Sequence, residues 1–217
     1  MLKGVKQITN KNIVHCDFNS LKNKLLDDSL NIKYILPLGI IDYKIIKNHK
    51  YYINDGIKIL CPDDEIVELF DNKNSFTKFM LNYHPNYIPD IYYLDGIKIK
   101  DIKYPAIYKP MYSTSGSGIK IIYGESDLLQ LPNYNNIQKF IEDEYEYGAH
   151  MLCIDGEIVK YKIMRYKYDK YTIKTANFPK NYENVNDFDI SVFKDILKTL
   201  QYSGGGRVLI SNLKIIE

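Results

Sequence analysis

The sequence predicts an α+β protein whose first 70 residues form a small α/β unit. Three observations carry this prediction. Short apolar runs alternate with helix-like segments up to about Phe70. Asp95-Gly96 and Asp155-Gly156 each separate two β-branched runs, which is typical of a tight hairpin. Residues 189–202 repeat apolar side chains at helical spacing, so we expect this helix to pack into a core.

In the first 70 residues, a helix is predicted over residues 20–30, where Leu21, Leu25 and Leu26 share a face and Ser20 suits the N-cap. The other predicted elements are a buried strand at 34–38, a short helix at 42–46, a strand at 57–60 and a helix that begins at the acidic run 63–65.

The middle of the chain begins with a predicted helix over residues 71–82, whose apolar stripe is Phe76, Phe79 and Met80. Two prolines break it before a strand at 91–94. Further on, strands at 105–108 and 119–123 flank a loop of serines, threonine and glycines.

The last third begins with a predicted hairpin of strands 150–154 and 157–164. Residues 167–186 are polar, and we expect a long loop there with a short strand at 171–174. After the helix at 189–202, residues 203–206 are expected to cap it and lead into a final strand at 208–216.

Composition excludes several classes of protein. The net charge is only +2, and the 21 tyrosines accompany a general excess of Asn, Ile and Lys, so nucleic-acid binding is not favoured. Cys16, Cys61 and Cys153 lie far apart, which argues against disulfides or a zinc site and for a reducing, cytoplasmic environment. The N-terminus has no apolar core of a signal peptide, and no membrane span is expected.

Residues 104–123, YPAIYKPMYSTSGSGIKIIY, carry the clearest functional pattern. Strand residues enter Lys109, and the loop that follows offers backbone N–H and hydroxyl donors that can converge on an anion. A lysine at the end of the strand would add a point charge there. The alternative is a flexible hairpin loop beside a surface lysine.

Four stretches, in this order, resemble the ATP-grasp superfamily: Asn72-Lys73 with Phe76, YPAIYKP with its Gly/Ser loop, IQKFIEDEYEY before the second hairpin, and GGGRVLISNLKII. The resemblance covers Asp71 to the C-terminus. It implies an ATP-grasp fold with lobe A at 71–136, a shortened lobe B at 137–217, and a pre-ATP-grasp-like unit at 1–70. It also implies an ATP- and Mg²⁺-dependent ligase that joins a small-molecule or peptide carboxylate to an amine, or a thiol, through an acyl-phosphate.

The resemblance assigns nucleotide-binding roles residue by residue. Lys109 would contact a phosphate and the base edge, Glu146 the ribose hydroxyls, and Lys73 the nucleotide, with Lys78 as an alternative to Lys73. The phosphate-covering loop would contain Ser113, Ser115, Gly116, Ser117 and Gly118. The hinge whose backbone reads adenine would be Gln138, Lys139, Phe140 and Ile141.

Basic residues after the second hairpin are candidates for catalysis, because charge that develops on transferred oxygens requires fixed cations. We single out Lys162, Arg165 and Lys174. Lys160 shares a strand face with Lys162, so both or neither should point inward.

The metal site departs from the family pattern. Asn212 stands where the resemblance expects an aspartate for Mg²⁺, and Glu217 is the other candidate ligand. This leaves two further hypotheses open: a catalytically reduced pseudoenzyme that binds nucleotide or a protein partner, and a nucleic-acid binder. The sequence does not indicate the oligomeric state.

Overall fold

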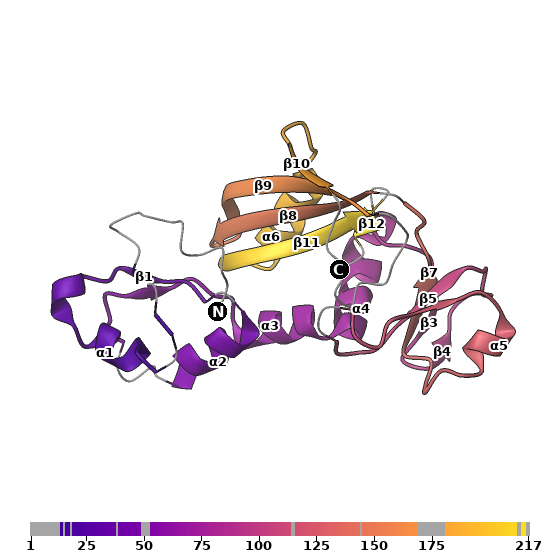
Figure 1. Ribbon diagram of the computed structural model, residues 1–217, viewed down its shortest axis with the longest axis horizontal. Helices are drawn as coiled ribbons and strands as arrows, with labels where there is room; N and C mark the ends of the chain where they lie inside the picture. The colour runs from indigo at the N-terminus through magenta and orange to yellow at the C-terminus, as the bar shows by residue number, and fades with distance from the viewer. Residues whose placement is uncertain are drawn as a thin grey trace. The chain divides into compact units, whose positions relative to one another are not determined.

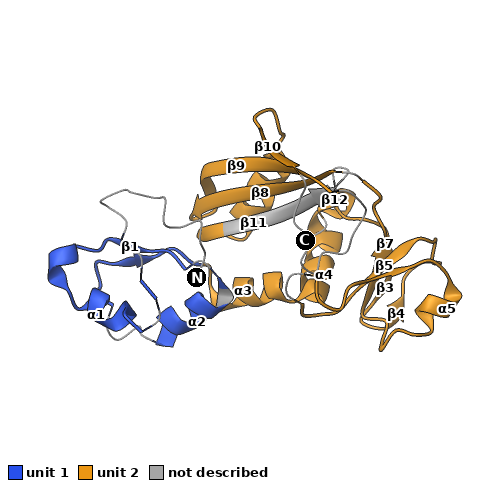
Figure 2. Ribbon diagram, in the orientation of Figure 1, with its two compact units in different colours: residues 1–61 blue, residues 62–217 orange. Residues whose placement is uncertain are grey.

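The computed structural model describes residues 14, 16–17, 19–37, 39–48, 53–113, 116–143, 145–168, 181–211 and 214–215 (Figure 1). The chain divides into two compact units, residues 1–61 and 62–217 (Figure 2). No helix in the described part of the chain is long and apolar enough to cross a bilayer.

The first unit is a small α/β arrangement around Leu21, Leu25 and Ile46. Its strands β1 and β2 pair in parallel. Its elements are α1 (Leu21–Leu25), a 3-10 turn (Asp28–Leu30), β1 (Tyr34–Ile35), α2 (Ile40–Asn48) and β2 (Lys58–Ile59).

Two predictions for this unit need correction. The helix predicted over 20–30 ends at Leu25, because Asp27 accepts from the N–H of Ser29 and starts a separate turn that closes at Asn31 with φ 44°. Ser20 is the N-cap residue, but its hydroxyl bonds Asp17 instead of the helix. The strand predicted at 34–38 stops at Ile35 and is not buried, since Tyr34 is 58% exposed.

The second unit begins with two helices, α3 (Asp64–Asp71) and α4 (Lys73–Tyr83). Asn72 separates them: its side chain accepts from the N–H groups of Asn74 and Ser75 and so caps α4. The predicted stripe of α4 is confirmed, because Phe76, Phe79 and Met80 belong to one hydrophobic core. Another side of α4 buries the polar Asn74 and Thr77.

An antiparallel sheet follows, in the strand order β4-β3-β7-β5-β6. One of its faces carries the core residues Tyr92, Ala106, Tyr108, Ile122 and Ile137. The elements are a 3-10 turn (Pro85–Tyr87), β3 (Ile91–Leu94), β4 (Ile97–Lys98), β5 (Ala106–Lys109), β6 (Lys120–Ile122), α5 (Glu125–Leu128) and β7 (Asn136–Lys139).

A second antiparallel sheet has the order β10-β9-β8-β11-β12. Its core contains Ala149, Met151 and Ile163 from the sheet, together with Phe193 and Ile196 from α6. The elements are β8 (Tyr145–Ile154), β9 (Glu157–Lys167), β10 (Asn181–Val185), α6 (Ser191–Thr199), β11 (Gly204–Ser211) and β12 (Lys214–Ile215).

Both Asp-Gly hairpins are confirmed. Asp95 and Gly96 have φ angles of 52° and 78°, and Asp155 and Gly156 have 51° and 82°. Each turn joins two antiparallel strands, β3 to β4 and β8 to β9. Two positive φ values in succession are the geometry that selects this dipeptide.

Two predictions near the C-terminus are wrong. Residues 204–206 do not cap α6 but begin β11, where they pair with residues 151–153 of β8, and the left-handed residue after the helix is Gln201, with φ 46°. Strands occupy parts of the loop predicted at 167–186: β9 extends to Lys167, and β10 (Asn181–Val185) pairs with β9. The short strand predicted at 171–174 lies outside the described residues.

Candidate functional site

Five polar or charged side chains are buried in the described part of the chain, and all belong to α4 and to the paired strands β5 and β7. They are Asn74, Thr77, Lys109, Asn136 and Gln138. Buried polar groups are costly unless they are bonded, and they tend to gather where a protein recognises something polar. This group is the candidate site.

Lys109 is the last residue of β5 and only 7% exposed. Its neighbour across the sheet is Asn136. An ammonium withdrawn from water is stabilised by negative charge, and the low local dielectric strengthens that attraction. Lys109 is thus a buried cation at the start of the Gly/Ser loop, the place where the sequence analysis expects an anionic ligand.

A short series of hydrogen bonds links β7 to α4. The Asn136 Nδ2 donates to Thr77 Oγ1 at 2.9 Å, and Thr77 Oγ1 donates to the backbone carbonyl of Lys73 at 2.7 Å. Gln138 Nε2 donates to Asn136 Oδ1 at 3.5 Å. These bonds satisfy polar groups that would otherwise be buried alone.

The Gly/Ser loop after β5 is anchored where α3 meets α4. The N–H of Lys73 donates to Met111 O at 2.9 Å, and its Nζ donates to Ser113 O at 3.3 Å. The Tyr112 hydroxyl donates to Glu68 Oε1 at 2.5 Å. The first residues of the loop are thus held by the backbone and side chain of Lys73 and by the side chain of Glu68, about forty positions earlier in the chain.

Within the loop, the Ser113 hydroxyl is buried with no hydrogen-bond partner among the described residues. Gly116 and Gly118 have φ angles of 77° and 75°, and Ser117 is exposed. A Cβ on Gly118 would lie 3.2 Å from Pro110 Cγ. The loop thus keeps the conformation that requires glycine, with a hydroxyl available inside it. Ser115 lies outside the described residues.

Most backbone N–H and C=O groups of the predicted hinge are already hydrogen-bonded within the protein, so few are left for a base. β7 is a central strand, paired with β3 on one edge and β5 on the other. Beyond it, the N–H of Lys139 bonds Asp90 O at 2.8 Å and the N–H of Phe140 bonds Pro105 O at 3.3 Å. In the described part of the chain, the N–H of Ile141 makes no hydrogen bond. Of the predicted hinge residues, Ile141 is thus the one whose N–H remains open within the described part of the chain.

The β8–β9 hairpin places Glu146 and Lys162 on one face of its sheet. Glu146 pairs with Tyr166, and Lys162 with His150, whereas Ala149 and Ile163 point to the core on the other face. Lys160 lies on the face of Lys162, as expected. The Tyr166 hydroxyl is 3.2 Å from His150 Nε2.

Arg165 lies on the opposite face of β9 from Lys162, so the structure does not bring these two predicted catalytic cations together. Its guanidinium forms an ion pair with Glu183 and lies 4.8 Å from the centre of the Tyr145 ring. These contacts suit a role in holding β10 against β9.

The remaining predicted residues, Lys174, Asn212 and Glu217, lie outside the described residues. Within the described ranges, no three His, Cys, Asp or Glu side chains form a group that could hold a metal. Sequence reasoning missed Asn74, Thr77 and Asn136, because polar residues three apart on a helix usually indicate its solvent face. Only the three-dimensional structure, in which Asn136 of β7 donates to Thr77, reveals that this side of α4 is buried.

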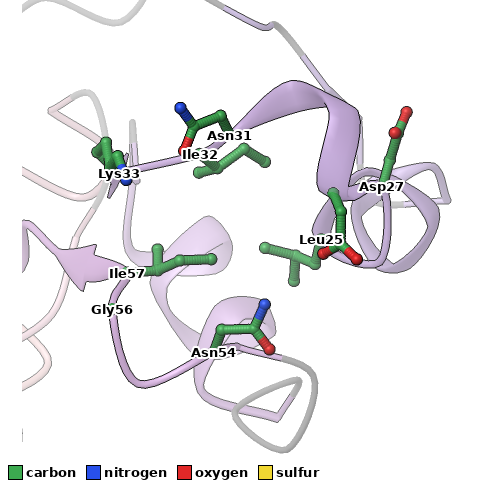
Figure 3. Close-up of a pocket in the computed structure, with 9 residues that line it drawn as sticks. Leu25, Asp27, Asn31, Ile32, Lys33, Asn54, Gly56 and Ile57 are labelled. Atoms are coloured by element: carbon green, nitrogen blue, oxygen red, sulfur yellow. The ribbon is translucent and has the colours of Figure 1, made fainter.

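The first unit contains a small cavity of about 210 Å³ (Figure 3). Figure 3 shows Leu25 and Ile57 directed toward each other across it, while the Asp27 carboxylate points away. Asp27 instead accepts from the N–H and hydroxyl of Ser29. None of the residues that line this hollow belongs to the group of buried polar side chains, so it is not the candidate site. The residues that line it are Leu25, Asp27, Asp28, Asn31, Ile32, Lys33, Asn54, Gly56 and Ile57.

Sequence comparison finds no family model that matches the chain. The carbamoyl phosphate synthase large chain of Methanobrevibacter smithii is 23% identical over 148 residues, which are 66% of this chain. The chain spans only 13% of that protein.

Three solved structures resemble the chain more extensively. D-alanine–D-alanine ligase from Bacillus anthracis has a TM-score of 0.51 and 19% identity, with 90% of this chain and 71% of that chain covered. The biotin carboxylase domain of Hydrogenobacter thermophilus 2-oxoglutarate carboxylase, in complex with MgADP and bicarbonate, gives 0.58 and 18% over 94% and 52%. The Campylobacter jejuni biotin carboxylase complexed with β,γ-ATP gives 0.56 and 15% over 88% and 49%.

Proposed function

We propose, from the premise that this chain has the ATP-grasp fold, that it binds ATP at the buried polar group of α4, β5 and β7. The bound ATP would activate a carboxylate as an acyl-phosphate, and an amine or thiol would then displace phosphate. The observation that carries this proposal is the burial of Lys109 at the end of β5, directly before an anchored Gly/Ser loop.

The proposal gives the described residues the following roles. Lys109 and the Ser113 hydroxyl supply charge and a donor to the phosphates. Glu146 would accept from the ribose hydroxyls. Lys162, exposed on the face that carries Glu146, would stabilise charge on the transferred phosphoryl group. Arg165 is engaged by Glu183, so we assign it no contact with substrate.

In the first step a carboxylate oxygen attacks the γ-phosphorus, and the bond from that phosphorus to the bridging oxygen of ADP breaks. In the second step an amine attacks the acyl carbon, phosphate leaves with the bonding electrons, and the amine loses a proton. Mg²⁺, when bound, would neutralise charge on the phosphate oxygens. Its proposed donors Asn212 and Glu217 lie outside the described residues, so no step is assigned to them.

Calorimetry with ATP and Mg²⁺ tests the binding claim. We expect wild-type protein to bind and Lys109→Met to lose at least about tenfold in affinity, since a charge-assisted contact is removed. Lys98→Met is the matched control, because Lys98 is an exposed lysine on the same sheet that pairs with Asp101. Absence of ATP binding by folded wild-type protein would overturn the proposal.

Turnover is tested separately by phosphate release with mixtures of carboxylates and amines. Release that depends on a carboxylate supports the ligase. ATP binding without release above background, across a broad panel, would favour the pseudoenzyme alternative.

A further inference from the structure

We propose that Glu68, Asn72 and Tyr112 are positioning residues that hold residues 111–113, the entry to the Gly/Ser loop, against the junction of α3 and α4. The entry is thereby ordered before the triphosphate of ATP arrives. This inference rests on the proposed function, and it gives a role to side chains that do not themselves touch the nucleotide.

Helix α4 fixes the direction of the Asn72 side-chain amide. The Oδ1 of Asn72 accepts from the backbone N–H groups of Asn74 and Ser75, each at 3.1 Å. A backbone N–H can only donate, so the oxygen of the amide must face the helix. The Nδ2 of Asn72 consequently points away from the helix, where it donates to the Tyr112 hydroxyl at 3.1 Å.

The Tyr112 hydroxyl therefore has a defined donor role. Its oxygen accepts from Asn72, and its single proton is donated to Glu68 Oε1 at 2.5 Å. A hydroxyl that donates to a carboxylate makes a charge-assisted bond, which is shorter and stronger than a bond between neutral groups. The bond to Glu68 also raises the pKa of the Tyr112 hydroxyl, so this group keeps the proton that it donates.

The two partners of Tyr112 are held at a fixed spacing by the end of α3. The backbone N–H of Asn72 donates to Glu68 O at 2.9 Å and closes the last turn of that helix. Glu68 and Asn72 are therefore one helical turn apart on a rigid backbone. The hydroxyl of Tyr112 meets an acceptor and a donor whose positions the helix ends determine, and this contact crosses 40 to 44 positions of sequence.

Backbone bonds on either side of Tyr112 complete the attachment. The carbonyls of Met111 and Ser113 accept from the N–H and the Nζ of Lys73. Any residue offers a carbonyl, whereas the contact of Tyr112 requires a hydroxyl, and its ring is 51% exposed. Ser113, whose buried hydroxyl is a proposed phosphate donor, follows directly. Because its backbone is ordered in advance, ATP binding does not bear that entropy cost.

The test compares the binding of ATP with Mg²⁺, measured by calorimetry, and of adenosine, measured by NMR titration. Tyr112→Phe should weaken ATP binding about threefold to tenfold and leave adenosine binding unchanged, because adenosine has no phosphate for the loop to meet. Glu68→Leu should show the same loss, whereas Glu68→Gln keeps an acceptor and should stay within about twofold of wild type. The Tyr112→Phe/Glu68→Leu double variant should lose no more than either single variant, since both remove one bond.

Tyr123→Phe is the matched control, because Tyr123 is an exposed tyrosine directly after β6, the strand that pairs with β5. Unchanged ATP affinity in Tyr112→Phe, or equal losses for ATP and adenosine, would overturn the inference.

Limited proteolysis of the protein without nucleotide gives a second measurement. Cleavage between residues 113 and 118 should be at least about threefold faster in Tyr112→Phe than in wild-type protein or Tyr123→Phe, because the entry to the loop is released. Equal cleavage rates overturn the inference whether or not ATP binds. If cleavage accelerates as expected but wild-type protein binds no ATP, it is the proposed function that fails.

Discussion

The Lys73 ammonium donates to the carbonyl of Ser113 at 3.3 Å, so the first turn of α4 anchors the Gly/Ser loop. Lys78, the alternative of the sequence analysis, instead pairs with Asp95 and touches the β3–β4 turn. The two lysines, both in α4, therefore contact different segments of the chain: Lys73 contacts the Gly/Ser loop, and Lys78 contacts the β3–β4 turn.

Lys73→Ala should weaken ATP binding by about threefold to tenfold, because a released loop must be ordered again on binding. Lys78→Ala is the control and should leave the affinity unchanged. Calorimetry, together with limited proteolysis between residues 113 and 118, measures both effects. Equal loss of affinity in the two variants would contradict the assignment.

The two Asp-Gly turns provide a matched pair of glycines. Gly96 and Gly156 both have positive φ, but a Cβ on Gly96 meets nothing within 4 Å, whereas on Gly156 it would lie 2.9 Å from Lys198 Cα and 3.1 Å from Leu197 O. Gly96→Ala should cost about 1 kcal/mol of unfolding free energy from backbone conformation alone. Gly156→Ala should cost about 1–3 kcal/mol more, as overpacking against backbone does. Urea unfolding measures both, and equal losses would refute the packing argument.

Gly148 accommodates the ring of Tyr166, since a Cβ there would lie 2.8 Å from Tyr166 Cε2. Gly148→Ala should destabilise the protein by about 1–3 kcal/mol, because the ring must leave its position beside His150. In a Tyr166→Leu background the same substitution should cost less than about 0.5 kcal/mol. A double-mutant cycle with no coupling would show that the ring does not occupy this space.

Burial raises the pKa of the Cys153 thiol from 9.0 to about 11. The unfolded chain therefore releases this proton at lower pH than the folded chain. The contribution of this thiol to the free energy of unfolding is fully present below pH 9 and is lost as pH rises toward 11. The slope from this group is about 1.4 kcal/mol per pH unit. Unfolding measured from pH 8 to 11 should show a steeper fall for wild-type protein than for Cys153→Ala, in which the other titrating groups are kept. Parallel curves would contradict the assignment.

Much of the second unit could be predicted because local chemistry decides it. Both Asp-Gly turns adopt two successive positive φ angles, which this dipeptide favours. The apolar stripe of α6 specifies which face of that helix is buried. Lys109 could be placed at a strand end for the same reason. The resemblance to a nucleotide-binding fold then followed from the order of such stretches.

Other features depend on partners that are distant in sequence. Glycines 204–206 appear suited to a helix cap, yet pairing with β8 makes them a strand. Arg165 and Lys162 are both plausible cations for a phosphate, but only the register of β9 separates their faces. Asn136 and Thr77 are 59 positions apart, and no local pattern in either segment indicates that they meet.

Helix α4 contributes Met80 and Phe76 to a hydrophobic core that contains residues of both sheets, and Thr77 to a hydrogen bond with β7. Because α4 packs against both sheets, its loss would expose buried residues of both. Amide hydrogens of α4 should consequently exchange with solvent only when residues 62–217 unfold as a whole, at the slowest rate in this unit. Motion within this unit is then expected in the Gly/Ser loop and in the two Asp-Gly hairpins, while α4 stays in place.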